Sequence, residues 1–328
     1  MFHLRKPYHK LLETNTIAQY KRLVAAKLAN FTEGVAQVRM AGQATKLGHL
    51  DRTTTEPRDK ELLQVEITSI DAPNEKIRLL KLGLQGGPSK FLAGQWLDTF
   101  VPGDPKPGGF TIASSPSAAA RPIDPYLELA VQEAPENPAA AWLWRPKEEI
   151  LGKILQVRVG GSFVCPPIGG LGGIRHIVLV AGGVGINPLM SILGYLADES
   201  ETLNISISIF YGTKVPVNGK LDNILFLNRI RALYDQRPIA GNLKLFLTGP
   251  FDRTKDIVGS ATGNFSIKPG RMTAADLLPE LRTADTKDST LVYVCGPPAM
   301  TDYFVGLLTA PDMADIFNAA HVKSEKWW

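Results

Sequence analysis

The feature that most constrains this chain is an apolar run that ends in a glycine-rich turn. From Ile177 to Ala197 there is no charged residue, a length that suits a membrane span. Glycine, asparagine and proline interrupt the middle of the run, which is typical of a turn rather than of a spanning helix. We therefore expect a buried strand, a tight turn and a buried helix in a soluble protein. The turn and the helix start comprise Gly182, Gly183, Val184, Gly185, Ile186, Asn187 and Pro188.

This turn has the chemistry of an anion site. Glycine permits positive φ and a close approach of a ligand to the backbone. We expect Asn187 to cap the following helix and Pro188 to be its first residue. The free N–H groups and the helix dipole would then favour a diphosphate. The alternative is a tight strand-to-helix turn without a ligand, because a glycine-rich turn alone is a weak signal.

The second half of the chain alternates between strand and helix patterns. Such alternation indicates a parallel sheet with right-handed crossovers. We expect the segment Gly249–Arg271, rich in Gly, Thr and Asp, to be a loop between two units. Strands are expected at His176–Ala181, Asn204–Tyr211, Leu243–Thr248 and Leu291–Cys295, and helices at Pro188–Asp198, Leu221–Tyr234, Ala274–Arg282 and Pro298–Leu308.

The first half is rich in short alternating runs that Gly and Pro clusters separate. Several short strands at this spacing favour an antiparallel barrel or sandwich. One short helical segment, Pro138–Trp144, interrupts them. The expected strands are Leu62–Ser69, Ile77–Leu84, Gln95–Val101, Phe110–Ala113, Tyr126–Gln132 and Ile154–Val159.

A second turn follows a later strand, where residues 293–300 read Tyr-Val-Cys-Gly-Pro-Pro-Ala-Met. Open α/β sheets bind ligands at the carboxyl ends of their strands. We therefore expect Cys295, Gly296 and Pro297 to lie at the same crevice as the first turn. The alternative for Cys295 is a small core residue. It is not interpreted as a nucleophile, because no histidine lies in an evident partner motif.

Charge is uneven along the chain, whose 36 Lys and Arg exceed its 32 Asp and Glu for a net charge of +4. Residues 1–50 hold eight basic and two acidic residues. This composition is typical of a mitochondrial transit segment, so we predict a mitochondrial location, with the cytoplasm as the alternative. The segment's own alternatives are a docked arm or a disordered tail. We predict an extension over 1–50, a β-rich domain over 51–172 and an α/β domain over 173–328.

Composition excludes several classes of protein. Only Cys165 and Cys295 occur, which excludes a disulfide scaffold and a four-cysteine zinc or iron–sulfur site within this chain. The five histidines show no metal-ligand spacing, so no metal site is predicted. The small net charge and the lack of a long basic run argue against a nucleic acid partner.

The two turns, in this order and after a β-rich domain, resemble the ferredoxin–NADP reductase superfamily, in which a flavin-binding barrel precedes a Rossmann-like dinucleotide domain. The barrel matches at Ala93–Trp96, Phe110–Pro116 and Val159–Phe163. A closer resemblance, over roughly residues 50–328, is to the oxidoreductase NAD-binding domain-containing protein 1 family. That family's pattern is matched at Gly108–Ile112, Ala181–Pro188, Cys295–Pro298, Met300–Asp302 and Glu325–Trp328.

The resemblance implies roles for particular residues. Thr111 would place its hydroxyl near the flavin N5, where hydride is exchanged, and Cys295 would flank the nicotinamide. Tyr211–Lys214 would lie near the adenosine, and the turn at Gly182–Asn187 would bind the diphosphate. Trp328 resembles a terminal aromatic that stacks on flavin in some relatives, with a packed or exposed tail as the alternative. The implied catalytic residues are Thr111 and Cys295, and the other implied cofactor contacts include Phe110, Ile112, Pro188, Gly296, Pro297 and Trp328.

Two departures from the superfamily pattern bear on the flavin. The arginine that pairs with the flavin diphosphate is replaced by Gly108, so a charge-assisted contact is lost. The second phosphate motif, Gly-x-x-Ser/Thr, is replaced near Asn137–Trp142. A helix capped by Asn137 and begun by Pro138 would still offer backbone N–H groups there.

We predict an NAD(P)H-dependent flavin oxidoreductase that passes hydride from nicotinamide to flavin, and electrons on to an unidentified protein or small molecule. The resemblance favours NAD(H) and, by analogy, FAD, whereas Lys214 and Lys220 leave NADP(H) open. One alternative is a flavin-free dinucleotide-binding regulatory or assembly protein. Another is a reductase that docks on a protein partner through residues 1–50.

Overall fold

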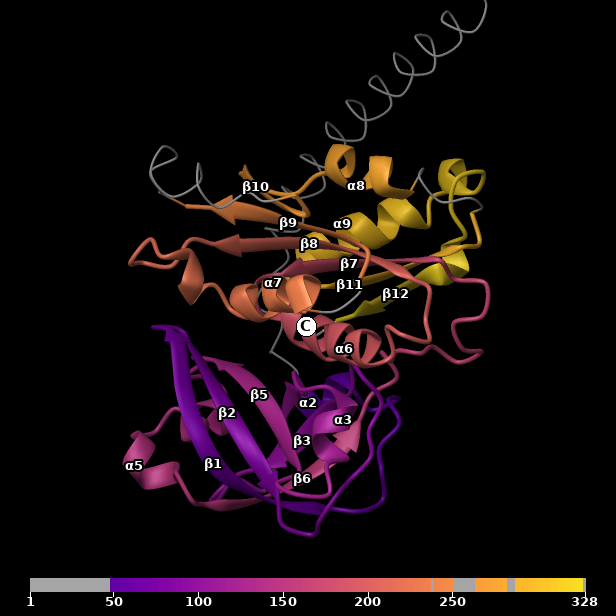
Figure 1. The fold of residues 1–328 in the computed structure, drawn as a ribbon. Coiled ribbons are helices and arrows are strands. Elements are labelled where there is room, and N and C mark those ends of the chain that lie inside the picture. The colour runs from indigo at the N-terminus through magenta and orange to yellow at the C-terminus, as the bar shows by residue number, and fades with distance from the viewer. Residues whose placement is uncertain (1–47, 237–238, 250–262, 282–286, 327–328) are drawn as a thin grey trace, which may run out of the picture. The chain divides into compact units, whose positions relative to one another are not determined.

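The computed structural model describes residues 48–236, 239–249, 263–281 and 287–326. Within these ranges an antiparallel sheet is followed along the chain by a parallel one (Figure 1), which confirms the predicted order of barrel and α/β unit. The predicted targeting segment lies outside the described residues except for positions 48–50, and Trp327 and Trp328 lie outside them as well. The domain limits after residues 50 and 172 stay a prediction.

The antiparallel sheet has six strands in the order β4-β3-β6-β1-β2-β5 among the described residues. A bridge between Ile112 and Leu129 links the chain just after β4 to β5, the opposite edge, and so closes the sheet into a barrel. Alternation explains which face is inside: Leu155 and Val157 of β6 are buried, whereas Ile154 is exposed. The strands are β1 Leu63–Asn74, β2 Ile77–Leu84, β3 Trp96–Phe100, β4 Gly108–Thr111, β5 Tyr126–Gln132 and β6 Ile154–Gly160. The helices of this half are α2 His49–Arg52, α3 Pro116–Ala119, α4 Pro138–Leu143 and α5 Lys147–Ile150.

The parallel sheet has the order β10-β9-β8-β7-β11-β12 in the described part of the chain. Helices α6 and α7 lie on one side of it and α8 and α9 on the other (Figure 1), so every residue of β7 is buried. The strands are β7 His176–Gly182, β8 Ser206–Lys214, β9 Gly241–Thr248, β10 Phe265–Pro269, β11 Thr290–Cys295 and β12 Val322–Glu325. The helices are α6 Ile186–Asp198, α7 Leu227–Gln236, α8 Ala274–Leu281 and α9 Pro298–Leu308, with the 3-10 turns η1 Gly183–Gly185, η2 Leu221–Asn223, η3 Pro311–Met313 and η4 Ala319–His321.

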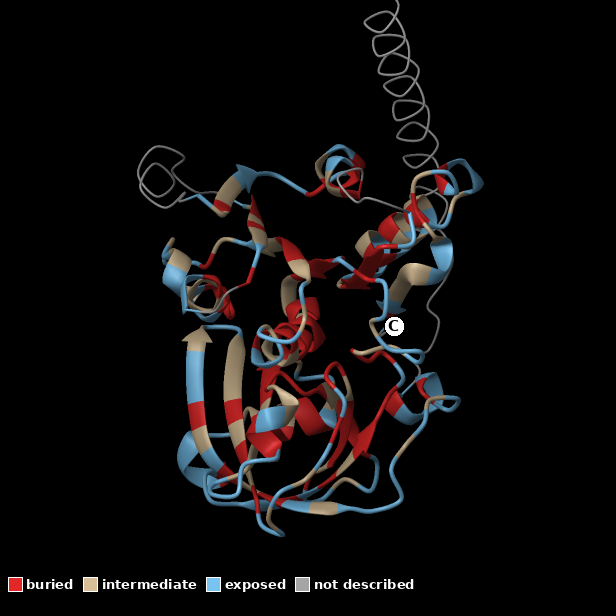
Figure 2. Cartoon of the chain, turned by 45° about the vertical axis from the view of Figure 1, so that its right-hand side comes forward, coloured by how far each residue is buried: buried red, intermediate tan, exposed pale blue. Residues whose placement is uncertain are grey.

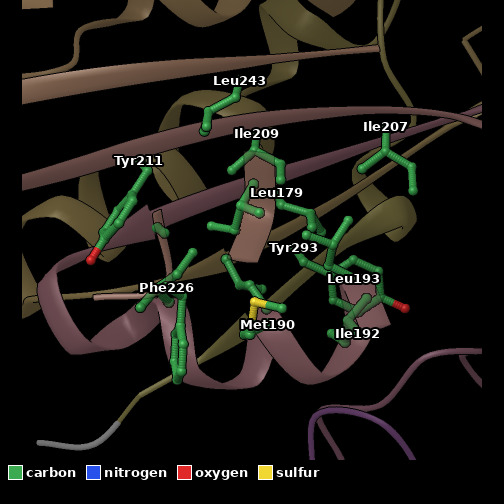
Figure 3. Packing of buried hydrophobic residues seen from close by; sticks show 14 of the residues in the cluster. Leu179, Met190, Ile192, Leu193, Ile207, Ile209, Tyr211, Phe226, Leu243 and Tyr293 are labelled. Carbon is green, nitrogen blue, oxygen red and sulfur yellow. The ribbon is translucent and has the colours of Figure 1, made fainter. Parts of the chain in front are cut away.

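The core of this half forms where α6 packs on the middle strands. Leu179 and Ile209 of the sheet face Met190 and Leu193 of the helix (Figure 3), and all four are at most 4% exposed. Buried residues are continuous from the sheet into α6 (Figure 2). The uncharged run from Ile177 to Ala197 therefore forms β7, a turn and α6. Among the described residues, no helix is both long and apolar enough to cross a bilayer.

Two expectations about the elements are wrong. The expected loop Gly249–Arg271 contains β10, which pairs in parallel with β9 through its alternating residues Phe265 and Ile267. The expected helix Leu221–Tyr234 is divided into η2 and α7, because Phe226 between them adopts a φ of +61°. A residue with this backbone conformation cannot continue an α-helix.

Candidate functional site

The glycine-rich turn between β7 and α6 has one position that faces open space. Gly183 adopts a φ of +53°, and a Cβ atom built on it would meet no atom within 4 Å. The residues around it are packed, because Gly182, Gly185 and Ile186 are all buried. Gly183 is therefore the position of this turn where a ligand can approach the backbone without displacing protein atoms.

The other glycines of the turn face the second predicted turn, between β11 and α9. A Cβ atom on Gly185 would lie 2.3 Å from the carbonyl oxygen of Cys295, and one on Gly182 would lie 2.6 Å from Cδ of Pro297. Gly296 has little space as well, since its Cβ would lie 2.4 Å from Cε of Met300 and 3.0 Å from Cα of Gly182. The structure thus brings the two motifs together. The close approach of the Cys295 backbone is a sufficient reason for glycine at position 185, and the contact of Gly185 with a dinucleotide stays a prediction.

Asn187 does not cap α6. The helix begins at Ile186, its N-cap position is Gly185, and no side chain makes a capping hydrogen bond. The Asn187 side chain instead donates from Nδ2 to the carbonyl of Ala130 in β5, at 2.9 Å. One turn further on, Ser191 donates to the carbonyl of Ser114 at 2.7 Å. The start of α6 is therefore joined to the barrel beside the end of β4.

Cys295 ends β11 at the carboxyl edge, as predicted, but its side chain is 1% exposed. Burial and the nearby Glu325 carboxylate raise the pKa of this thiol well above its ordinary value. The thiol stays protonated at neutral pH, so Cys295 contributes shape and backbone rather than a nucleophile.

Glu325 is a candidate site residue for which the sequence predicted no role. It is the partner of Cys295 in the β11–β12 pairing and is 9% exposed. A largely buried carboxylate at the carboxyl edge of a parallel sheet lies where ligands bind. The available signal was its position in the terminal Glu-Lys-Trp-Trp segment, which matches the family pattern and in which the resemblance implies a role for Trp328 alone.

The segment Tyr211–Lys214 ends β8, as expected for residues near an adenosine, but its members differ in exposure. Tyr211 is 1% exposed, and burial raises its pKa. Lys214 is exposed at the strand end, where it pairs in register with Thr248 of β9. Lys214, at the end of this segment, is therefore accessible at the carboxyl edge of the sheet, whereas Tyr211 is not.

The residues predicted to contact flavin occupy β4 of the barrel and the position after it. Thr111 is 6% exposed and pairs with Trp96 of β3. Ile112 is 0% exposed and packs in the barrel core. Phe110 is half-buried against the same core.

The position that would carry the diphosphate-binding arginine is closed. A Cβ atom on Gly108 would lie 2.4 Å from Cβ of Ala139 in α4 and 2.8 Å from Cε2 of Phe110, whereas ordinary contact begins at 3.4 Å. Helix α4 therefore packs on β4 more closely than any side chain at position 108 allows. The residues present do not fit the diphosphate arm of a flavin dinucleotide bound in that manner.

An ionic cluster covers the neighbouring Gly109. A Cβ atom there would lie 2.2 Å from the ring of His49, whose Nε2 is 2.8 Å from Oδ1 of Asp98. Asp98 also accepts hydrogen bonds from Arg58 at 3.0 Å and Arg158 at 2.6 Å. Although burial opposes ionisation, these hydrogen bonds lower the pKa of Asp98 to about 2. No local pattern predicts this cluster, because its members are far apart in the chain.

An antiparallel barrel followed by a parallel sheet, with a glycine-rich turn packed on a Cys-Gly-Pro turn, defines a protein of the ferredoxin reductase class. A family model described as "Oxidoreductase NAD-binding domain" matches residues 179–305. The protein "Oxidoreductase NAD-binding domain-containing protein 1" from Bos taurus is 33% identical over 283 residues, covering 85% of each chain. This chain belongs to the oxidoreductase NAD-binding domain-containing protein 1 family.

Two solved structures show the same fold. The CS-b5R domains of human Ncb5or, in the NAD+ form, align with a TM-score of 0.60 and 19% identity, over 81% of this chain and 70% of that one. A ferredoxin NADP+ reductase from Neisseria gonorrhoeae with bound FAD and NADP aligns with a TM-score of 0.57 and 17% identity, over 82% of this chain and 100% of that one. At these identities the likeness concerns the fold alone.

Proposed function

We propose that this chain is an NAD(P)H-dependent oxidoreductase that binds its dinucleotide at the carboxyl edge of the parallel sheet. The observation that carries the proposal is the direct packing of the turn at Gly182–Gly185 on the turn at Cys295–Pro297, beside the open Gly183. The family model over residues 179–305 supports the same edge. A nicotinamide dinucleotide supplies hydride when bound.

The chain's own residues would bind and orient that dinucleotide. The positive end of the α6 dipole lies next to the open Gly183 and favours the negative diphosphate there. The Cys295–Pro297 turn would flank the nicotinamide, and Lys214 would lie on the adenosine side. NAD(H) follows from the family resemblance, and Lys214 leaves NADP(H) open. The mitochondrial location remains a proposal from the N-terminal composition.

A resident FAD is not part of this proposal, because Gly108 and Ala139 leave no room for the usual diphosphate contact. That observation favours a second candidate, a dinucleotide-binding regulatory or assembly protein that uses no flavin. The acceptor of electrons in the first candidate is an exchangeable small molecule or protein.

Binding and turnover of NADH and NADPH by the full chain separate the two candidates. We expect saturable binding of at least one nucleotide, measured by calorimetry, and its oxidation when ferricyanide is supplied as a probe acceptor. If a nucleotide binds but is oxidised neither with ferricyanide nor with added FMN as the acceptor, the second candidate is favoured. Failure to bind either nucleotide would reject both.

A further inference from the structure

The first relevant observation is the contact between β4 and α4 at Gly108. In the superfamily that this barrel resembles, the residue at this position pairs with the flavin diphosphate. Here Gly108 is buried, and Ala139 occupies the space that the first atom of any side chain would need. The ring of Phe110 folds over the same position, as its Cε2 and Cζ atoms lie 2.8 and 3.2 Å from a Cβ atom there. The space for an anion-binding side chain is therefore filled by protein.

The second observation concerns the amide donors of α4, which would otherwise attract a phosphate. Pro138, its first residue, has no N–H group. The N–H of Ala140 donates to the Asn137 side chain at 3.2 Å, and the N–H of Ala141 donates to the Asn137 carbonyl at 2.8 Å. The N–H of Ala141 is thus part of the helix, and the cap that the sequence predicted takes the N–H of Ala140, one of the few donors that a phosphate could otherwise use.

The third observation concerns the cation that contacts α4. Arg78 donates to the carbonyls of Leu143 and Arg145, at 3.2 and 2.6 Å, at the end of the helix opposite to Gly108. Its guanidinium also lies 4.7 Å from the ring centroid of Trp144. This arginine is held at the last carbonyl of α4 and at the turn that follows the helix, so it does not substitute for the missing arginine at position 108.

From these three observations we propose that the barrel of this chain has no binding position for a flavin diphosphate, so that any flavin it takes is recognised through its ring alone and exchanges freely. The phosphate and adenylate parts of FAD would then add nothing to affinity. Donor groups and a cation normally supply that increment through charge-assisted hydrogen bonds. Flavin, where used at all, would be a substrate rather than a resident group.

The test compares riboflavin, FMN and FAD on the full chain, freed of bound small molecules, by quenching of flavin fluorescence. We expect the dissociation constants of riboflavin and FAD to differ by less than about tenfold, or about 1.4 kcal/mol, or none of the three to bind. FAD that binds more than tenfold more tightly than riboflavin, or that survives gel filtration at one per chain, would overturn the proposal. Titration of the same samples with NADH reports separately on the function proposed for the α/β half.

A pair of variants tests the cause. The double variant Gly108→Arg with Ala139→Gly removes the obstructing methyl and restores the cation, so we expect it to bind FAD at least about tenfold more tightly than Ala139→Gly alone. Gly108→Arg alone should gain no FAD affinity and should melt at a lower temperature, because Ala139 collides with it. A gain in FAD affinity from Gly108→Arg alone would overturn the proposal. If the double variant does not fold, the comparison of the three flavins on the unmodified chain still decides.

Discussion

In the α/β half, Gly185 lets the Cys295 carbonyl approach, and the two turns so joined leave Gly183 open. In the barrel half, Gly108 lets Ala139 approach, and the space beside β4 is filled. In both halves a glycine therefore allows another part of the chain to pack directly on its backbone. What differs is whether an open position remains next to that contact. A glycine in a binding motif is evidence for a ligand only when the atoms facing it belong to no other part of the chain.

The largest loss of stability is expected from breaking the ionic cluster around Asp98 in the barrel. Asp98→Ala leaves the Arg58 and Arg158 guanidinium groups without the carboxylate that they share at a side chain 0% exposed. Breaking a buried ion pair from one side costs about 3–5 kcal/mol, which urea unfolding would measure. The exposed Asp59→Ala is the matched control, with about 0.5 kcal/mol or less expected. An equal effect of the two changes would show that the cluster does not hold the barrel.

The same cluster predicts a dependence on pH. The pKa of Asp98 falls from 3.8 to about 2 on folding. Its contribution to the free energy of unfolding is therefore fully present above pH 3.8 and is lost as the pH falls toward about 2. The difference in unfolding free energy between the wild type and Asp98→Asn should therefore shrink from pH 4 to pH 2, as measured by urea unfolding at each pH. A difference that stays constant over this range would contradict the assignment.

A second comparison sets the two tight glycines against each other. Gly185→Ala and Gly108→Ala each place a methyl about 1 Å too close to a neighbour, so each should destabilise the chain by about 1–3 kcal/mol. Only Gly185→Ala should weaken dinucleotide binding, by about tenfold or more, because it pushes the Cys295 turn away from the turn at Gly183. Calorimetry with NADH and NADPH checks this. A loss of affinity in Gly108→Ala equal to that in Gly185→Ala would remove the distinction between the halves.

The smallest effect on stability is expected at the open glycine. Gly183→Asp and Gly183→Asn should each cost about 1 kcal/mol or less of stability, because no atom lies within 4 Å and both side chains tolerate a φ of +53°. Aspartate should weaken dinucleotide binding by about tenfold through repulsion of the diphosphate, and asparagine by much less.

Gly152→Asp is the matched control for this charge, since Gly152 in the barrel also has a positive φ and open surroundings. It should leave dinucleotide affinity unchanged. Equal binding by Gly183→Asp and Gly183→Asn would place the diphosphate elsewhere.

Much of the fold could be predicted from local patterns. The uncharged run with its glycine-rich turn predicted β7 and α6, and α9 and strands β2 and β5 have the predicted limits. The missed strand β10 is short and lies at the edge of the sheet. Its alternation of Phe265 and Ile267 with polar residues spans only five residues in a Gly-, Thr- and Asp-rich segment, which is too short to stand out from a loop.

The atoms that each site residue faces could not be predicted. Asparagine is typical of a helix cap, but the side chain of Asn187 donates to the barrel carbonyl of Ala130 instead. A glycine in such a turn is typical of a ligand contact, but the backbone that faces Gly185 is that of Cys295, 110 positions along the chain. Such contacts depend on how distant segments pack, and local propensity carries no information about them.

The hydrogen bonds from α6 to the barrel also bear on which substitutions this chain tolerates. Asn187 and Ser191 both reach barrel carbonyls because positions four apart share a helix face. Inserting one residue between them would rotate one side chain away by about 100°. Both acceptors are main-chain carbonyls, which any residue supplies, whereas the donors need a polar side chain at two fixed helix positions. As far as these hydrogen bonds are concerned, we therefore expect substitutions to be tolerated at Ser114 and Ala130 and to be selected against at Asn187 and Ser191.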